Sequence, residues 1–189
     1  MRHMVKFLKI FAANNCIFAS DAVCTALKNL RTRSALTKLE KNLGLDGLKQ
    51  TCLRLAERLQ AGDSILLHGP LAAGKTQFVN FLADALGSVD PVTSPTFGLA
   101  NFYKTGGVPI LHIDTYRLED QAEYRQLGLD EYYDSHITLV EWGDKVRSDF
   151  EDPLEIYFDF GAEGERQVTF SWQASRWASI VDHAVAAQS

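Results

Sequence analysis

The sequence predicts an α/β protein of three layers, in which helices cover both faces of a mixed, largely parallel central sheet. Two observations support this prediction. A phosphate-binding loop stands between a short apolar run and a segment of helical periodicity, and strand-like runs then alternate with helical segments along the chain. This order is typical of P-loop NTPase folds, so we expect residues 34–189 to form one such domain.

The phosphate-binding loop reads Gly-Pro-Leu-Ala-Ala-Gly-Lys-Thr over residues 69–76 and matches G-x-x-x-x-G-K-[ST] without a mismatch. The apolar run at 64–68 predicts a buried strand before it, and residues 77–86 predict a helix after it. In such a loop, backbone N–H groups and the helix N-terminus surround phosphates. Lys75 contacts the β- and γ-phosphates, and the Thr76 hydroxyl ligates Mg²⁺. The chain is therefore predicted to bind a nucleoside triphosphate.

Composition excludes several classes of protein. No apolar stretch reaches the ~18 residues that span a bilayer, and the three cysteines lack the spacing of a disulfide framework or a zinc site. These features predict a cytoplasmic protein with free thiols and no membrane contact. The net charge is −5, yet residues 1–45 hold eight Lys and Arg against only Asp21 and Glu40. The remainder is too acidic to bind nucleic acid well by itself, so a partner would hold any nucleic acid involved.

The first 33 residues are basic and almost free of acids, which predicts an N-terminal extension outside the domain. A later start at Met4 or a poorly ordered extension would produce the same composition. Organellar targeting is the less favoured interpretation of this segment.

Two elements are predicted before the phosphate loop. Residues 35–43 partly alternate between apolar and polar side chains and allow a strand. A helix follows, because apolar residues recur at three- and four-residue steps over 48–59. Asp46 is a candidate cap for its N-terminus, and residues 61–63 end it. Thr51 lies on this helix, where solvated surface is the simplest interpretation.

After the first helix, Gly87 is suited to a C-cap. Residues 92–97, Val-Thr-Ser-Pro-Thr-Phe, predict an ordered loop that either senses a γ-phosphate or is a turn with capping hydroxyls. Residues 98–103 and 108–114 predict two strands joined by a turn. Alternation places three polar side chains on one face if the extended conformation persists, namely His112, Asp114 and Tyr116. A carboxylate there can orient water or Mg²⁺, or it can belong to a structural polar cluster.

The second half of the chain adds one more motif. Residues 119–134 predict a partly helical, acidic, solvated segment, after which the apolar run 137–140 ends in Glu141. An apolar strand ending in an acid is the form of a Walker B element, whose carboxylate holds Mg²⁺ directly or through water. Residues 153–172 predict a hairpin, and residues 176–187 predict a terminal helix.

These segments together resemble the TsaE (YjeE) family of bacterial P-loop ATPases, which serve threonylcarbamoyladenosine modification of tRNA. The resemblance runs from about residue 36 to residue 146. It rests on four motifs in order: the phosphate loop, Ser94-Pro95-Thr96-Phe97, His112-Ile113-Asp114-Thr115-Tyr116-Arg117, and residues 137–142. The family loop usually reads Gly-Asp-Leu-Gly-Ala-Gly-Lys-Thr, whereas this chain has Pro70 for the acid and Ala72 for the middle glycine.

The resemblance implies ATP hydrolysis that requires the partner proteins TsaB and TsaD, which carry the tRNA chemistry. It makes Thr76 and Glu141 the Mg²⁺ ligands and makes Asp114 necessary for hydrolysis, with Lys75 at the phosphates. The ATP contacts that it implies are Thr51, Gly69, Ala72, Ala73, Gly74, Lys75, Thr76, Gln77, Thr96 and Trp142.

Three other functions share the phosphate loop. A small-molecule or nucleoside kinase would need extra arginines in a lid, and residues 119–144 offer only Arg125. A GTPase would carry an Asn-Lys-x-Asp motif, which the chain lacks. A nucleotide-dependent scaffold with little turnover stays open, because the altered loop residues permit binding without efficient hydrolysis.

Overall fold

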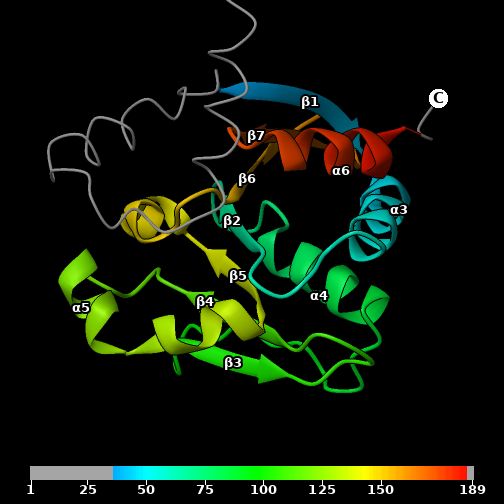
Figure 1. The fold of residues 1–189 in the computed structure, drawn as a ribbon. Helices are drawn as coiled ribbons and strands as arrows, with labels where there is room; N and C mark the ends of the chain where they lie inside the picture. The colour runs from blue at the N-terminus through cyan, green and yellow to red at the C-terminus, as the bar shows by residue number, and fades with distance from the viewer. Residues whose placement is uncertain (1–35, 187–189) are drawn as a thin grey trace, which may run out of the picture. The chain divides into compact units, whose positions relative to one another are not determined.

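The structure is a computed structural model that describes residues 36–186. A seven-stranded sheet runs through its middle in the order β1-β7-β6-β2-β5-β4-β3 (Figure 1). The four central strands β6, β2, β5 and β4 are parallel, and each flank adds antiparallel strands. In chain order the strands are β1 (Thr37–Leu43), β2 (Ser64–His68), β3 (Ala100–Tyr103), β4 (Ile110–Asp114), β5 (Ile137–Glu141), β6 (Leu154–Phe160) and β7 (Arg166–Trp172).

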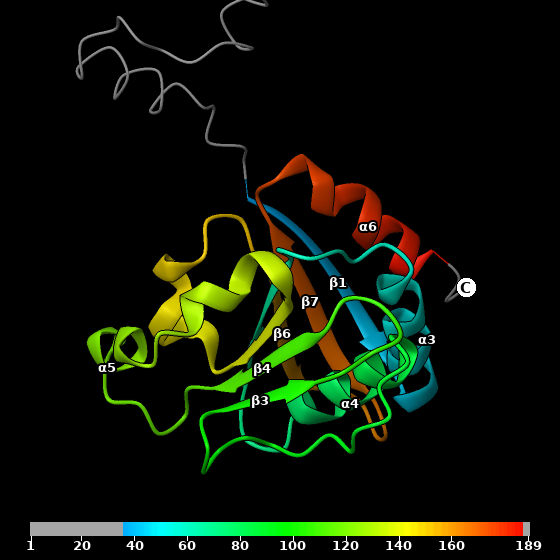
Figure 2. The same ribbon diagram turned by 60° about the horizontal axis from the view of Figure 1, so that its bottom comes forward.

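Helices cover both faces of the sheet, which confirms the three predicted layers. One face carries α3, α4 and α6, and the other carries α5 with two 3₁₀ helices, η1 and η2 (Figures 1 and 2). Their bounds are α3 (Leu45–Ala56), α4 (Lys75–Ala85), α5 (Gln121–Gln126), η1 (Leu129–Ser135), η2 (Gly143–Asp149) and α6 (Ser175–Val185).

The central strands are buried on both sides, which explains why they read as apolar runs in the sequence. In β2, Ile65 and Leu67 belong to the core under α3, α4 and α6, whereas Leu66 belongs to the core under α5 and the 3₁₀ helices. The same alternation puts His112, Asp114 and Glu141 on the α4 side of the sheet, because Ile110 and Leu139 lie in that core. Polar side chains therefore share a face with α4 at one end of the sheet.

The ends of two helices differ from the prediction. Gly44, not Asp46, is the N-cap of α3, and Asp46 lies in the first turn, where its charge favours the helix dipole. Helix α4 begins at Lys75, two residues before the expected start, because Gly74 is its N-cap. The C-cap of α4 is Leu86, one residue before the predicted Gly87. Gly87 follows the cap with φ +78°, and the next N–H, that of Ser88, donates to the carbonyl of Ala83 at 2.9 Å.

Strand β4 ends at Asp114, so the extended conformation does not continue to Tyr116 as the alternation required. The Asp114 Oδ1 atom accepts the backbone N–H of Tyr116 at 2.9 Å, which turns the chain directly after the strand.

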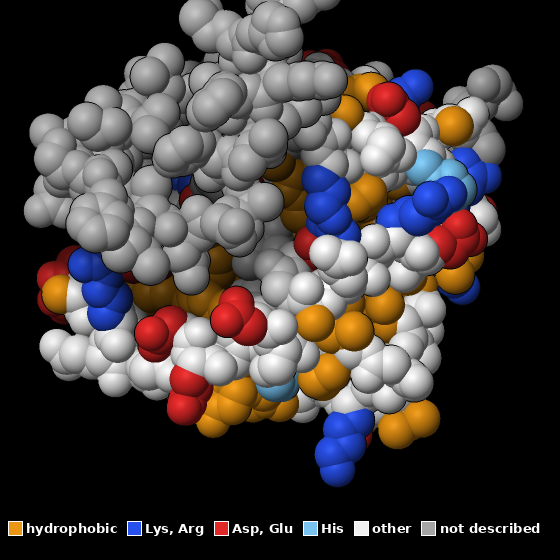
Figure 3. All heavy atoms as spheres, viewed as in Figure 1, with side chains coloured by type: hydrophobic (Ala, Val, Ile, Leu, Met, Phe, Trp, Pro, Cys, Tyr) orange, Lys and Arg blue, Asp and Glu red, His pale blue; other side chains and the backbone are white. Residues whose placement is uncertain are grey.

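The predicted acidic segment, residues 119–134, is confirmed as surface. All its Asp and Glu side chains are exposed, and Figure 3 shows acidic side chains gathered on the α5 side.

Some predictions fall outside the described residues. The basic N-terminal extension lies there, as do Cys16 and Cys24, and Ala187 at the end of the predicted terminal helix. Within residues 36–186, Cys52 is a buried free thiol, and burial raises its pKa. No helix among these residues is long and apolar enough to cross a membrane.

Candidate functional site

The predicted motifs meet where the parallel strands β2, β4 and β5 end. Asp114 and Glu141 are direct neighbours across the β4–β5 ladder, and the phosphate loop follows β2 at the same edge. Ligands of open α/β sheets bind outside the carboxyl ends of the strands. A pocket of about 360 Å³ lies here and is lined by Leu71, Ala72, Gly74, Lys75, Thr76, Gln77, Ser94, Thr96, Asp114, Tyr116, Glu141 and Trp142.

The phosphate loop needs glycine for two reasons. Gly69 has φ +130°, and a Cβ atom there would lie 2.2 Å from the carbonyl oxygen of Phe158 on β6. Gly74 has φ +113° and forms the N-cap of α4 without a side-chain hydrogen bond, which leaves the first N–H groups of the helix available to an anion. Ala72 also has a positive φ, +63°. The replacement of the family glycine therefore places an alanine in the left-handed region, where it is strained.

The Lys75 ammonium lies among carbonyls and an aromatic ring. It donates to the carbonyls of Gly69 at 2.7 Å and Pro70 at 2.9 Å, and it lies 3.8 Å from the centroid of the Trp142 ring. Burial holds the pKa of Lys75 below its ordinary value, and the charges of Glu141 and Asp114 oppose this shift. The lysine is therefore held at the loop by weak neutral acceptors that an anionic oxygen can replace.

Thr76 and Glu141 are in direct contact. The Thr76 hydroxyl lies 2.8 Å and 3.0 Å from the two carboxylate oxygens of Glu141. The His112 Nε2 atom lies 3.0 Å from Glu141 Oε1 on the other side. Because a carboxylate only accepts, Nε2 carries the proton. This contact brings together a hydroxyl and a carboxylate, the oxygen ligands that Mg²⁺ prefers.

Asp114 organises the loop over residues 92–97. Its Oδ2 atom accepts hydrogen bonds from the Ser94 hydroxyl at 3.0 Å and from the Thr96 hydroxyl at 2.6 Å. The two hydroxyls are also 2.6 Å apart. The predicted loop is therefore attached through its hydroxyl groups to the end of β4 and forms one wall of the pocket.

Trp142 forms another wall, directly after β5. It has φ +60°, and its ring lies 5.0 Å from that of Tyr116. Thr115 holds this segment, because its hydroxyl donates to the Trp142 carbonyl at 2.6 Å and its N–H donates to the Glu141 carbonyl at 3.1 Å. A non-glycine residue with positive φ costs about 1 kcal/mol or more and persists where its surroundings fix it.

The charges of the site favour a cation. Lys75, Asp114 and Glu141 are all buried, so one ammonium stands against two carboxylates. Buried charges are normally paired or coordinate metals. Within residues 36–186 no group of three or more His, Cys, Asp or Glu side chains forms a metal site. The Thr76 hydroxyl and the Glu141 carboxylate are oxygen donors of the kind that Mg²⁺ takes, and a bound phosphate would supply further oxygens.

Most of the predicted site residues come together here. Ala72, Gly74 and all later members of the set line the pocket, while Gly69 and Ala73 shape the loop from behind. Thr51 does not join them. It is buried, not solvated, and its hydroxyl lies 2.9 Å from the Gly47 carbonyl within α3. Helical periodicity placed Thr51 on the correct helix but did not show which elements cover that side.

A second pocket, of about 400 Å³, was not predicted. It shares Ala72, Gly74 and Gln77 with the first pocket and continues on the far side of the phosphate loop. Its other lining residues are Leu43, Gly44, Leu45, Leu48, Gly164 and Arg166. The β6–β7 hairpin contributes two of them, and no sequence signal ties a distant hairpin to the loop.

A larger cavity, of about 430 Å³, lies at the opposite end of the strands, beside Asp63, Pro153 and Trp177. Its one lining arginine, Arg176, contacts both carboxylate oxygens of Asp63, and its other charged lining residues are the acids Asp134, Asp149, Glu151 and Asp152. It contains no loop of positive-φ residues before a helix. We therefore assign the anion site to the smaller pocket.

Comparison with known proteins identifies the family of this chain. A family model described as threonylcarbamoyl adenosine biosynthesis protein TsaE matches residues 45–168. The chain belongs to the TsaE family. It is 37% identical over 123 residues to the Bacillus subtilis tRNA threonylcarbamoyladenosine biosynthesis protein TsaE, covering 64% of this chain and 77% of that protein. It is 39% identical over 134 residues to the Streptomyces coelicolor protein of the same name, covering 67% and 90%.

A solved structure agrees with this membership. The crystal structure of Bacillus subtilis YdiB superposes with a TM-score of 0.68 at 27% identity, over 82% of this chain and 98% of that one. The fold and the phosphate loop are accordingly those of a P-loop ATPase-type protein of the TsaE family.

Ala72 provides a test of the strained loop. Ala72→Gly should raise the free energy of unfolding by about 1 kcal/mol. Glycine adopts a positive φ without the strain that an L-residue has, and this gain exceeds the loss that comes from the larger conformational entropy of glycine in the unfolded chain. Urea unfolding measures the change. Ala73→Gly is the matched control: its methyl group is buried and its φ is not positive, so this change should destabilise. Equal destabilisation by both changes would contradict the strain.

Proposed function

We propose that this chain binds ATP with Mg²⁺ and hydrolyses it to ADP and phosphate, as a cytoplasmic component of tRNA threonylcarbamoyladenosine biosynthesis. The observation that carries the proposal is the Thr76–Glu141 contact at the uncapped N-terminus of α4. A hydroxyl, a carboxylate and a row of free N–H groups side by side suit a Mg²⁺-bound polyphosphate. Family membership supports the pathway, which the relatives carry in their names.

Each residue of the loop has a part in this proposal. The loop backbone and the first N–H groups of α4 hold the phosphates, and Lys75 exchanges the carbonyls of Gly69 and Pro70 for β- and γ-phosphate oxygens. Thr76 and Glu141 would hold Mg²⁺. When bound, that ion supplies positive charge to the phosphate oxygens, where negative charge develops during transfer.

Water is the favoured acceptor of the phosphoryl group. Asp114 holds Ser94 and Thr96 beside the pocket, and these groups are suited to orienting a water molecule. Among the described residues that line the pocket, none is an arginine, whereas kinases use lid arginines around the transferred phosphate. The composition of the pocket thus supports hydrolysis over transfer to a bound acceptor.

The second pocket gives the remainder of the nucleotide a place. It adjoins Ala72 and Gly74, so a phosphate chain held by the loop has direct access to it. Leu43, Leu45 and Leu48 give it an apolar wall that suits a base and ribose. We assign ATP contacts to this wall in place of Thr51.

The rim of the first pocket supports a protein partner. Leu71 and Tyr116 line the pocket and are 75% and 54% exposed, and Phe97, which follows the lining residue Thr96, is 85% exposed. The Arg117 guanidinium lies 4.2 Å from the centroid of the Phe97 ring and adds a cation to this rim. Exposed apolar side chains framed by polar groups mark interaction sites. We therefore expect TsaB-like and TsaD-like proteins to dock here and to hold the tRNA, which this acidic chain binds poorly by itself.

Lys75→Ala should weaken Mg-ATP binding about 100-fold or more, since two charge-assisted hydrogen bonds to phosphate are lost. Isothermal titration calorimetry measures the binding. Lys49→Ala, on the exposed surface of α3, is the matched control and should bind like the wild type. Wild-type affinity in the Lys75 variant would contradict the assignment of the phosphate site.

Glu141→Gln should lower hydrolysis about 100-fold or more while binding changes much less, because the amide keeps the size and hydrogen bonds of the carboxylate but lacks its charge. Phosphate release and ATP titration, each followed across Mg²⁺ concentrations, separate the two effects. Asp159→Asn on β6 removes an exposed acid and serves as the control. Unchanged turnover at every Mg²⁺ concentration would make Glu141 only a structural acid.

Asp114→Asn should keep ATP binding and lose partner-stimulated turnover, because the loop hydroxyls lose their anionic acceptor. Thr96→Ala should weaken the stimulation, and Thr105→Ala, in the β3–β4 turn, should not. Phosphate release is measured with and without the TsaB–TsaD pair. Full turnover of the isolated chain, unchanged by both partners, would favour an autonomous ATPase. Binding without turnover even with both partners would favour a scaffold.

A further inference from the structure

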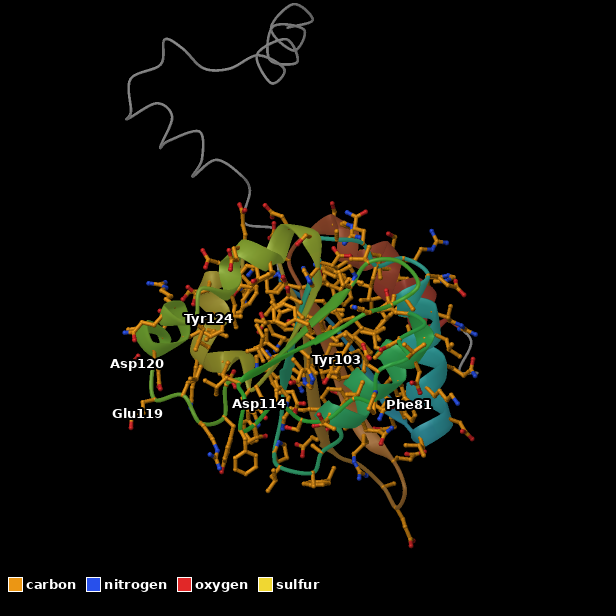
Figure 4. All side chains as sticks on the ribbon, turned by 90° about the horizontal axis from the view of Figure 1, so that it is seen from below. Phe81, Tyr103, Asp114, Glu119, Asp120 and Tyr124 are labelled. Carbon is orange, nitrogen blue, oxygen red and sulfur yellow. The ribbon has the colours of Figure 1, made fainter. Side chains whose placement is uncertain are left out.

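A bridge of two buried side chains joins Glu141 to the start of the 92–97 loop. His112 on β4 places Nε2 3.0 Å from Glu141 Oε1 and Nδ1 3.2 Å from the hydroxyl of Tyr103 on β3. The Tyr103 hydroxyl lies 3.0 Å from the carbonyl oxygen of Thr93. Tyr103 and Asp114 project from the neighbouring strands β3 and β4, in the same part of the molecule (Figure 4).

Each polar atom of the bridge has a partner. Since His112 Nε2 donates to Glu141, a neutral ring leaves Nδ1 to accept the Tyr103 O–H. The Tyr103 oxygen then meets the loop as an acceptor, because the backbone N–H of Thr93 donates to it at 3.4 Å. The Asn101 amide also links Tyr103 to the loop. Its Nδ2 atom donates to the Thr93 carbonyl at 3.1 Å and to the Tyr103 oxygen at 3.2 Å. Tyr103 and His112 are buried, so water does not compete for these bonds.

The loop is thereby attached to both buried carboxylates. Asp114 holds Ser94 and Thr96 directly, and Glu141 is connected to the backbone N–H of Thr93 through His112 and Tyr103. Outer partners of this kind fix the orientation of a metal-binding group and the basicity it shows. Here the same partners also fix the first residues of a loop.

We propose that His112 and Tyr103 are positioning residues that couple the orientation of the Glu141 carboxylate to the position of the 92–97 loop. The proposal rests on the proposed function only for the role of Glu141 as a Mg²⁺ ligand. The bridge itself is a property of the protein without nucleotide. A displacement of the loop changes the hydrogen bonds that orient Glu141, and a rotation of the Glu141 carboxylate changes the hydrogen bonds that position the loop.

Tyr103→Phe tests the coupling, because it keeps the ring and removes the hydroxyl that joins the two halves of the bridge. In the protein without nucleotide, amide hydrogen exchange over residues 93–98 should become about tenfold faster, with exchange in the central strands unchanged. The Mg²⁺ concentration for half-maximal hydrolysis should rise about tenfold, with the KM for ATP at saturating Mg²⁺ unchanged.

Tyr124→Phe is the matched control. It removes another buried tyrosine hydroxyl, which is bonded to Tyr133 on the opposite face of the sheet, and it should alter neither measurement. Unchanged exchange over residues 93–98 in Tyr103→Phe would overturn the proposal. A uniform acceleration through all strands would overturn it as well, since that result describes lost stability and not a coupled loop.

Two further variants distinguish a coupled loop from a loop with two independent supports. Glu141→Ala should also accelerate exchange over residues 93–98, and the double variant with Tyr103→Phe should exchange no faster than the faster single variant. Additive effects would show two independent supports and would overturn the coupling. If Tyr103→Phe does not fold, Asn101→Ala repeats the exchange measurement. Faster loop exchange together with no ATP binding would refute the proposed function and leave the bridge standing.

Discussion

The site depends on burying two carboxylates, Asp114 and Glu141, next to each other at the ends of β4 and β5. Such burial is unfavourable unless every charge has a partner. The molecule supplies hydroxyl donors from Thr76, Ser94 and Thr96 to the two carboxylates. The position of α4, the attachment of the loop over 92–97 and the fit to a divalent cation all follow from this requirement.

The parallel centre of the sheet makes this arrangement achievable. Neighbouring parallel strands end at the same edge, so the loop after β2, the carboxylate of β4 and the carboxylate of β5 converge without a long connection. The flanks of the sheet contribute differently. Strand β3 contributes the Tyr103 hydroxyl to the bridge, and β6 supplies the backbone against which Gly69 packs.

The sequence predicted the site wherever a motif is local. The loop over 69–76 has a fixed spacing, and Asp114 and Glu141 each end an apolar run, so each could be singled out from its own segment. That the two carboxylates are neighbours comes from the strand order of the sheet. Predictions that needed the surroundings were less accurate. Thr51 was assigned to solvated surface but is buried, because periodicity does not report what covers a helix. Tyr116 would share a face with His112 and Asp114 only if the extended conformation continued past residue 114, and the Asp114 side chain ends it by accepting the Tyr116 N–H.

The close contact between Gly69 and β6 makes the two sides of the site differ in how they are held in place. The first residue of the phosphate loop has no room for a methyl group beside the Phe158 carbonyl, so the loop begins in direct backbone contact with the sheet. The facing wall consists of Thr96 and its neighbours, attached by side-chain hydrogen bonds and flanked by the exposed Phe97 ring. The two walls are thus held by different means, one by backbone packing on the sheet and the other by side-chain hydrogen bonds, and the exposed Phe97 ring belongs to the second.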